Sequence, residues 1–287
     1  MSTKGWGMEA LFEDIDTLVA RVVDGATITL PSAFSSDISG ASMVATRALI
    51  RRGIRGLRMV CVPGGSLQAD MLIGAGCVAS VETGSMLLYE YGPAPRFVEA
   101  QLEGSIVVRD STCPAIHAAL IAGEKGLPFL PVRGILGSDI LAHRSGEWRT
   151  IDNPFGEHDP IVLIPALRPD VTLLHVPFAD REGNIWISHR TEFQTLARGA
   201  NMTLVTFDAF FDGNLLEDRR MAPGVVPAMY VAALSHQPRG AWPLLGGADQ
   251  PEDAEHMREY AALAKTAEGF REYLKRHVLS SPTRAPL

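Results

Sequence analysis

Short apolar runs recur along this chain at intervals that leave room for a helix between them, and this alternation most restricts how the chain can fold. The main runs are Thr27–Leu30, Leu57–Val62, Ile161–Ile164, Val171–Val176 and Met202–Phe207. The third and fourth are almost continuously apolar, which is typical of strands buried on both faces of a sheet. Strands of this kind that alternate with helices predict an α/β fold with a mostly parallel sheet flanked by helices.

Stretches with helical character lie between these runs. The expected helices are Met8–Val23, Met43–Arg52, Asp70–Ala75, Arg96–Glu103 and Pro114–Gly123, with short strands at 78–81 and 106–108. Glycine directly follows the second and fourth of these helices, at positions where a left-handed residue commonly ends a helix. A loop rich in glycine and proline is expected at Leu127–Gly137.

The end of the chain has a different composition. Pro251–Val278 is charged, rich in alanine and helical in pattern, with apolar residues on one face. We find no internal repeat and no low-complexity linker. The sequence therefore predicts a single domain over residues 1–287, with a C-terminal helical arm from about 248 to 287.

Composition narrows the possible partners. The 287 residues carry a formal net charge of −7 without a block of like charges, which argues against nucleic acid or an anionic membrane. No apolar run reaches the roughly 20 residues of a membrane span, and the first residues do not resemble a secretory signal. The three cysteines are too few and too widely spaced for a disulfide framework or a zinc site. A cytoplasmic protein without a metal is expected.

Several common catalytic patterns are missing. The segment Gly64–Gln68 begins like a serine nucleophile elbow but has glutamine where a second glycine must permit the sharp turn. No dinucleotide fingerprint, Walker A motif or HExxH sequence occurs. His158 lies between two acidic residues and is expected to be a solvated loop residue. His175 lies inside an apolar run and is expected to be a hydrogen-bonded core residue.

Glycine-rich loops directly follow several expected strands. In an open parallel sheet, the loops at the carboxyl ends of the strands line the ligand crevice. Glycine there lets a ligand approach main-chain N–H groups, which suits phosphates and thioester oxyanions. Any one such glycine more often makes a tight turn, but several loops in the same position favour a binding site.

Taken in order, these loops resemble the A subunits of family I coenzyme A transferases of the glutaconate CoA-transferase group. The resemblance runs from about residue 24 to residue 243. Its most specific segments are 63–65, 69–76, 126–134, 136–139, 164–171 and 179–184, and the helix 43–53 also agrees. The first loop departs from the family, because Ser32 and Ala33 replace two glycines and Ser42 replaces a proline, while Phe34 agrees.

The resemblance implies an enzyme that acts as part of a hetero-oligomer. It would move CoA between an acyl-CoA thioester and a free carboxylic acid. The nucleophilic glutamate would belong to a B subunit, with the site between the two chains. Coenzyme A is then a substrate, and no cofactor is permanently bound. The implied substrate or CoA contacts on this chain are Ser32, Phe34, Ser35, Gly40, Gly64, Gly65, Arg133, Gly137 and Asn184.

Two alternatives stay open. One is an acyl-CoA hydrolase on the same fold, as in steroid-ring degradation, which would need a carboxylate on this chain. Glu82 and Asp110 are weak candidates, although a loop hydrogen bond and a helix cap are the more common roles for such residues. The other alternative is a non-catalytic scaffold subunit. The arginines at 51, 52, 55 and 58 could bind CoA phosphates or simply complement helix ends.

Overall fold

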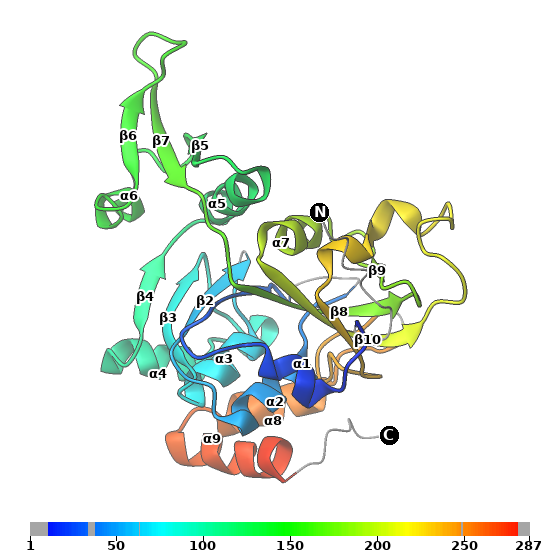
Figure 1. Cartoon of the computed structure of the whole chain (residues 1–287). Coiled ribbons are helices and arrows are strands. Elements are labelled where there is room, and N and C mark those ends of the chain that lie inside the picture. Colours follow the sequence, from blue (N-terminus) through cyan, green and yellow to red (C-terminus); the bar gives the residue numbers. More distant parts are fainter. Residues whose placement is uncertain (1–10, 34–37, 63, 248, 281–287) are drawn as a thin grey trace.

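The centre of the computed structural model, which describes residues 11–33, 38–62, 64–247 and 249–280, is a parallel sheet (Figure 1). Its parallel strands lie side by side in the order β4 (Val107–Asp110), β3 (Val78–Thr83), β2 (Leu57–Val62), β1 (Thr27–Pro31), β8 (Val171–Ala179), β10 (Met202–Phe210) and β12 (Ala233–His236). The short strands β9 (Ile185–Trp186) and β11 (Val225–Val226) extend it with antiparallel pairs. The predicted α/β fold is confirmed.

Helices connect the strands much as the sequence predicts. The helices beside the sheet are α1 (Ile15–Ala20), α2 (Met43–Arg52), α3 (Leu67–Gly74), α4 (Pro95–Glu103), α5 (Cys113–Lys125) and α7 (Glu192–Gly199). Helix α2 has its predicted bounds because Gly53 follows it in the left-handed conformation, with φ of 73°. Helix α1 begins later than predicted, because Asp14 caps it by accepting a hydrogen bond from the Thr17 N–H.

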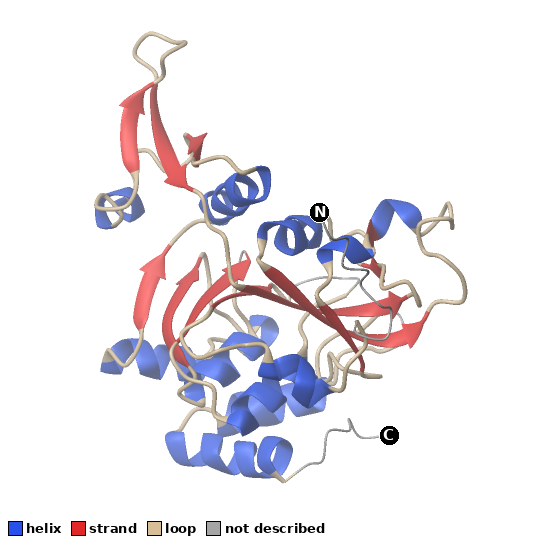
Figure 2. Cartoon of the chain, in the orientation of Figure 1, coloured by secondary structure: helices blue, strands red, loops and turns tan. Residues whose placement is uncertain are grey.

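Helices cover both faces of the sheet (Figure 2). Neighbouring side chains of a strand point to opposite faces. Met59 packs into the core formed with α1, α2, α3 and the C-terminal helices, while Val60 packs into the core that includes α5 and α7. The sheet is therefore a buried middle layer, and its accessible main-chain groups lie at the ends of the strands.

A small antiparallel sheet projects from the body (Figure 1). It consists of β5 (Phe129–Val132), β7 (Pro160–Pro165) and β6 (Arg149–Asp152), with α6 (Asp139–His143) beside it. Two predictions were wrong here, because the expected loop 127–137 contains β5, and 161–164 does not belong to the parallel sheet. The apolar side of β7 packs against alanines of α5, a tertiary contact that strand composition does not reveal.

The C-terminal segment is helical, as predicted, but divided. Helix α8 (Ala254–Leu263) and helix α9 (Ala267–Leu274) are followed by a π-helical turn at Lys275–Leu279. The buried Tyr260 hydroxyl donates to Asp70 of α3 at 2.7 Å, and the Phe97 N–H donates to the same carboxyl at 2.7 Å. Burial raises the pKa of Asp70 to about 6. No helix in the described ranges is long and apolar enough to span a bilayer.

Candidate functional site

The order of the strands defines one place where a ligand crevice is expected. From β1 the chain moves outward through β2, β3 and β4, and it later returns to add β8 on the other side of β1. Such a reversal is a topological switch point, and ligands bind there outside the carboxyl ends of the strands. The loops that begin at Ser32 after β1 and at Asp180 after β8 flank this point. The glycine loop after β2 lies beside them.

Arg190 holds the loop that follows β1. Its Nη2 donates to the main-chain oxygen of Ser32 at 3.0 Å, and its Nη1 donates to that of Ile38 at 2.6 Å. Its Nε pairs with Glu192 at 2.5 Å, and its guanidinium stacks 4.5 Å from the centre of the Phe193 ring. Arg190 is only 8% exposed. One buried cation therefore fixes both ends of the loop, although no sequence motif had drawn attention to it.

The described residues of this loop have defined structural partners. The Ser32 N–H donates to the main-chain oxygen of Val62 at 2.9 Å, and the Ser32 hydroxyl lies 2.9 Å from that of Tyr89. Gly40 has φ of +70°, and a Cβ there would lie 2.1 Å from the Phe193 ring. Gly40 is therefore required by backbone conformation and packing. The predicted contacts Phe34 and Ser35 lie outside the described residues.

The glycine pair after β2 lets two loops approach closely. The Gly65 N–H donates to the Ser85 oxygen at 2.8 Å, and a Cβ on Gly64 would lie 2.5 Å from the Ser85 hydroxyl. Ser66 follows the pair at the start of α3, but its hydroxyl makes no capping hydrogen bond. Among the residues that the structure describes, the buried hydroxyls of Ser66 and of Ser111, after β4, both have no hydrogen-bond partner. Each hydroxyl lies buried near the carboxyl end of a strand with its donor capacity unused.

The two catalytic candidates, Glu82 on β3 and Asp110 on β4, both accept hydrogen bonds from Arg144. Its Nη1 donates to Glu82 at 3.2 Å and to the main-chain oxygen of Asp110 at 2.9 Å. Arg109 adds a second cation 3.7 Å from the other Glu82 oxygen. Arg144 also contacts Glu147, and it is largely buried. Glu82 is thus the centre of an ion-pair network that docks α6 on the sheet, while Asp110 is exposed at the sheet edge.

The remaining predicted contacts lie farther along the chain. Arg133 and Gly137 belong to the projecting part, where Arg133 is 61% exposed and pairs with Asp159. The hydrogen bonds from Arg133 lower the pKa of Asp159 to about 2. Asn184 is buried beside β8, where its amide donates to Asp180 at 2.7 Å and its oxygen accepts from the Ala228 N–H at 2.9 Å. The Asn184 side chain is therefore used within the turn itself.

Three structural interpretations from the sequence agree with the structure. His175 is a core residue, with Nδ1 at 2.8 Å from the Thr206 hydroxyl and Nε2 at 3.2 Å from Asp208. Two of the four clustered arginines complement helix ends: Arg52 donates to main-chain oxygens at the end of α1, and Arg55 donates to those that follow α3. His158 is exposed, as expected.

Comparison with known proteins agrees with the fold. The chain is 29% identical over 257 residues to the cholesterol ring-cleaving hydrolase IpdA subunit of Rhodococcus jostii, covering 83% of each chain. It is 26% identical over 282 residues to the A subunit of 3-oxoadipate CoA-transferase from Pseudomonas knackmussii, covering 94% of this chain and 90% of that protein. The crystal structure of glutaconate coenzyme A-transferase from Acidaminococcus fermentans superposes with a TM-score of 0.85 at 25% identity, over 94% of this chain and 89% of that one.

The matches also show how much of this chain the family covers. A protein of Archaeoglobus fulgidus is 31% identical over 236 residues, but the match spans only 51% of that protein. The family model described as coenzyme A transferase matches residues 12–233, which include the projecting sheet and every strand of the parallel sheet except β12. The chain therefore belongs to the coenzyme A transferase family.

Proposed function

We propose that this chain is the A subunit of a two-subunit CoA-transferase that moves CoA between an acyl-CoA thioester and a free carboxylic acid. A B subunit supplies the glutamate nucleophile, coenzyme A is a substrate, and no permanently bound cofactor or metal takes part in the reaction. The chain works as one domain with its helical arm, in the cytoplasm. Its contribution is the carboxyl edge of the sheet, where the loops after β1 and β2 border the thioester.

The state of Glu82 carries this proposal. A carboxylate that attacks a thioester must be free to approach the carbonyl carbon. Both oxygens of Glu82 instead lie near guanidinium groups, at 3.2 Å from Arg144 and 3.7 Å from Arg109. Breaking this network would leave the largely buried Arg144 without one of its counter-charges. This arrangement suits a structural glutamate and favours a nucleophile from the partner.

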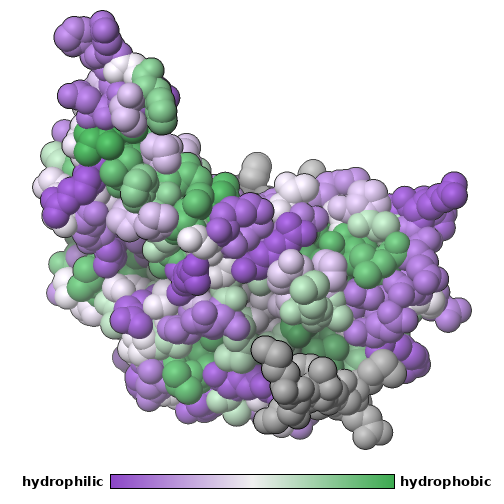
Figure 3. All heavy atoms as spheres, turned by 45° about the horizontal axis from the view of Figure 1, so that its top comes forward, coloured by the Kyte–Doolittle hydropathy of each residue, from purple (hydrophilic) through white to green (hydrophobic). Residues whose placement is uncertain are grey.

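Exposed apolar side chains on the projecting sheet support a partner subunit. Leu127, Phe129, Ile151 and Phe155 are 44%, 42%, 41% and 96% exposed. Figure 3 shows apolar residues gathered on this projection, below a polar tip. Contiguous exposed apolar surface of this kind marks interaction sites. We propose that the B subunit covers it.

The hydrolase remains the second candidate, favoured by the exposure of Asp110 and by the similarity to the ring-cleaving hydrolase subunit. In that reaction water replaces the acceptor acid, and a carboxylate of this chain would act as its base. The unpartnered hydroxyls of Ser66 and Ser111 could donate to a thioester oxyanion in either reaction. A non-catalytic scaffold subunit would supply neither a carboxylate base nor a donor to the oxyanion.

Covalent trapping distinguishes these functions. The complex of this chain with its B subunit is incubated with acyl-CoA, reduced with borohydride and mapped by peptide mass spectrometry. We expect a reduced glutamate on the B subunit, unchanged when this chain carries Glu82→Gln or Asp110→Asn. An adduct on this chain would refute the proposed division of roles. Thioester loss to water without an adduct, abolished by Asp110→Asn, would establish the hydrolase instead. Activity that persists without this chain would establish the scaffold.

A further inference from the structure

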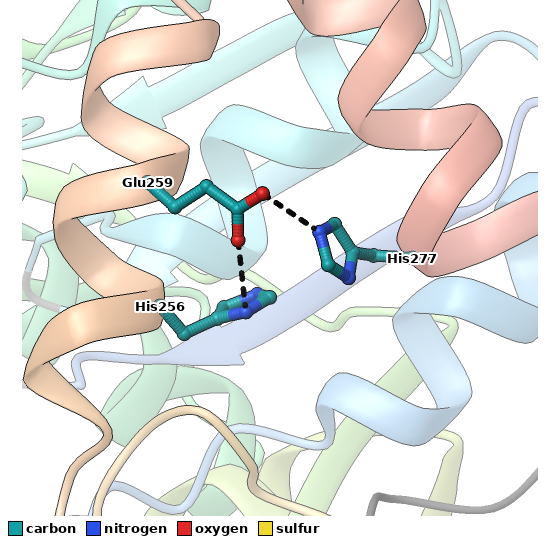
Figure 4. A group of neighbouring side chains, drawn as sticks. All are labelled: His256, Glu259 and His277. Atoms are coloured by element: carbon teal, nitrogen blue, oxygen red, sulfur yellow. Dashed lines mark hydrogen bonds and ion pairs between the residues drawn. The ribbon is translucent and has the colours of Figure 1, made fainter.

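Three potential metal ligands meet in the C-terminal arm, away from the carboxyl edge of the sheet. His256 and Glu259 lie three positions apart on α8, so their side chains share one face of that helix. His277 lies in the π-helical turn after α9. Figure 4 shows the Glu259 carboxylate between the two imidazole rings, with one oxygen directed at each. Among the described residues, these three side chains form the group suited to hold a metal ion.

The spacing of the donor atoms fits a single small cation after a modest adjustment. Glu259 Oε1 lies 3.2 Å from His277 Nε2, and Glu259 Oε2 lies 3.7 Å from His256 Nδ1. All three ligand atoms lie within 4.8 Å of one another. A tetrahedral ion with bonds of about 2 Å needs donors about 3.3 Å apart. The two carboxylate distances end on different oxygens of Glu259, so one oxygen and both nitrogens come together only when the partly exposed side chains of Glu259 and His277 turn toward the fixed ring of His256.

We propose that His256, Glu259 and His277 bind a zinc ion that clamps helix α8 to the segment following α9. Two imidazole nitrogens and one carboxylate oxygen are donors that zinc prefers, and water can complete its coordination. Glu259 is 34% exposed and His277 24% exposed, so both the ion and the water can enter from solvent. The proposed role is structural, because the group lies in the arm and not among the strand ends that form the candidate active site.

The surroundings of His256 support its role as a ligand. Its ring is 6% exposed, packs 4.2 Å from the Trp242 ring and is therefore fixed in orientation. Its Nε2 lies 2.8 Å from the hydroxyl of the buried Tyr273. When Nε2–H donates to this hydroxyl, the lone pair is on Nδ1, the atom that faces Glu259. Metal-binding histidines commonly have such a second hydrogen bond.

Arg276 competes with a metal ion for the Glu259 carboxylate, and it has Glu272 as an alternative partner. Its Nη1 lies 3.6 Å from Glu259 Oε1, a separation that compensates the Glu259 charge without metal. Its Nε lies 2.7 Å from Glu272, and its side chain is 52% exposed. When zinc binds Glu259, Arg276 can keep its ion pair with Glu272. Entry of the ion therefore does not leave a buried charge unpaired.

Zinc binding by the full-length, tag-free chain tests this proposal. After treatment with a chelator, the protein is titrated with Zn²⁺ in competition with a chromophoric chelator. We expect one ion per chain and a thermal midpoint that rises by several degrees, because a ligand that binds the folded state stabilises it. Co²⁺ in place of Zn²⁺ should give the visible absorption of a tetrahedral nitrogen and oxygen site. Neither measurement needs the B subunit or acyl-CoA, so the result is independent of the proposed reaction.

Matched variants locate the site. His277→Gln and Glu259→Gln should each weaken Zn²⁺ binding by at least about 10-fold and remove the thermal shift. His143→Gln, at an exposed histidine in α6, and Glu268→Gln, at an exposed carboxylate of α9, should keep both. Circular dichroism checks that each variant is folded, and either folded ligand variant suffices for the test. Absence of stoichiometric binding, or equal binding by ligand and control variants, would overturn the proposal.

Discussion

Replacing Arg190 by methionine tests whether the loop after β1 belongs to the active site. Methionine keeps much of the packing over Phe193 but removes the hydrogen bonds to the main-chain oxygens of Ser32 and Ile38. A hydrogen bond to a charged group contributes about 1.5–3 kcal/mol, so two correspond to about 3–6 kcal/mol. In the variant, the freed main-chain oxygens can partly form hydrogen bonds with water instead, which offsets part of this loss. We therefore expect the free energy of unfolding to fall by about 3 kcal/mol.

Urea unfolding of the chain and turnover of its complex with the B subunit provide the assays. Arg190→Lys should recover part of the stability, because an ammonium is a point charge without the planar fork of donors. Arg198→Met is the matched control on α7, since its ion pair with Glu124 is loose at 3.7 Å; it should lose less than about 1 kcal/mol.

We expect kcat/KM to fall in Arg190→Met beyond the fraction of protein that is unfolded, because the loop loses its position. The kcat/KM of Arg190→Lys should lie between the values of wild type and Arg190→Met. Unchanged stability in Arg190→Met would refute the clamp. Reduced stability with unchanged turnover would refute the role of the loop in the reaction.

Three further changes test the packing and charge of the fold. Gly40→Ala should cost at least about 3 kcal/mol in urea unfolding, because it combines a left-handed backbone with a clash against the buried Phe193 ring; a loss below about 1 kcal/mol would contradict this. Because burial raises the folded-state pKa of Asp70 from 3.8 to about 6, this group destabilises the fold above pH 6 and ceases to do so as the pH falls toward 4. Relative to wild type, Asp70→Asn should therefore gain up to about 3 kcal/mol between pH 4 and pH 7, and a pH-independent difference would refute this. Glu82→Gln should lower the thermal midpoint by a few degrees, because Arg144 loses a counter-charge, and full stability would show that the network is dispensable.

Local patterns predicted the central elements well. Strand β2 and helix α2 have their predicted bounds, because an apolar run and a helix ended by Gly53 are both local signals. The projecting sheet was not predicted. Its strands β5 and β7 are apolar like those of the parallel sheet, and their antiparallel pairing depends on contact with α5. The sequence indicated a strand at 161–164 but could not assign it to a sheet, and it indicated a loop where β5 lies.

For the candidate site, the sequence could predict loops after the strands but not the contacts that hold them. Glycines after expected strands located the carboxyl edge, and Gly40 and Gly64 indeed lie where a side chain would clash. Arg190 escaped prediction because its partners are main-chain oxygens more than 150 positions away, which no local motif records. The sequence around Ser66 only partly matches a nucleophile elbow, whereas the structure adds that its buried hydroxyl has no partner within the described ranges.

The arginines show why charge alone could not locate a site for the phosphates of coenzyme A. Arg52 neutralises helix-end carbonyls, Arg190 holds a loop and Arg144 compensates Glu82, so each is committed to a partner inside the fold. Arg133 differs, because its ion pair with Asp159 is largely exposed. Exposed pairs contribute little and are screened by salt, so exchanging the Asp159 carboxylate for a phosphate would sacrifice little stability. Among these four arginines, we therefore predict that Arg133 is the one that meets an anionic substrate.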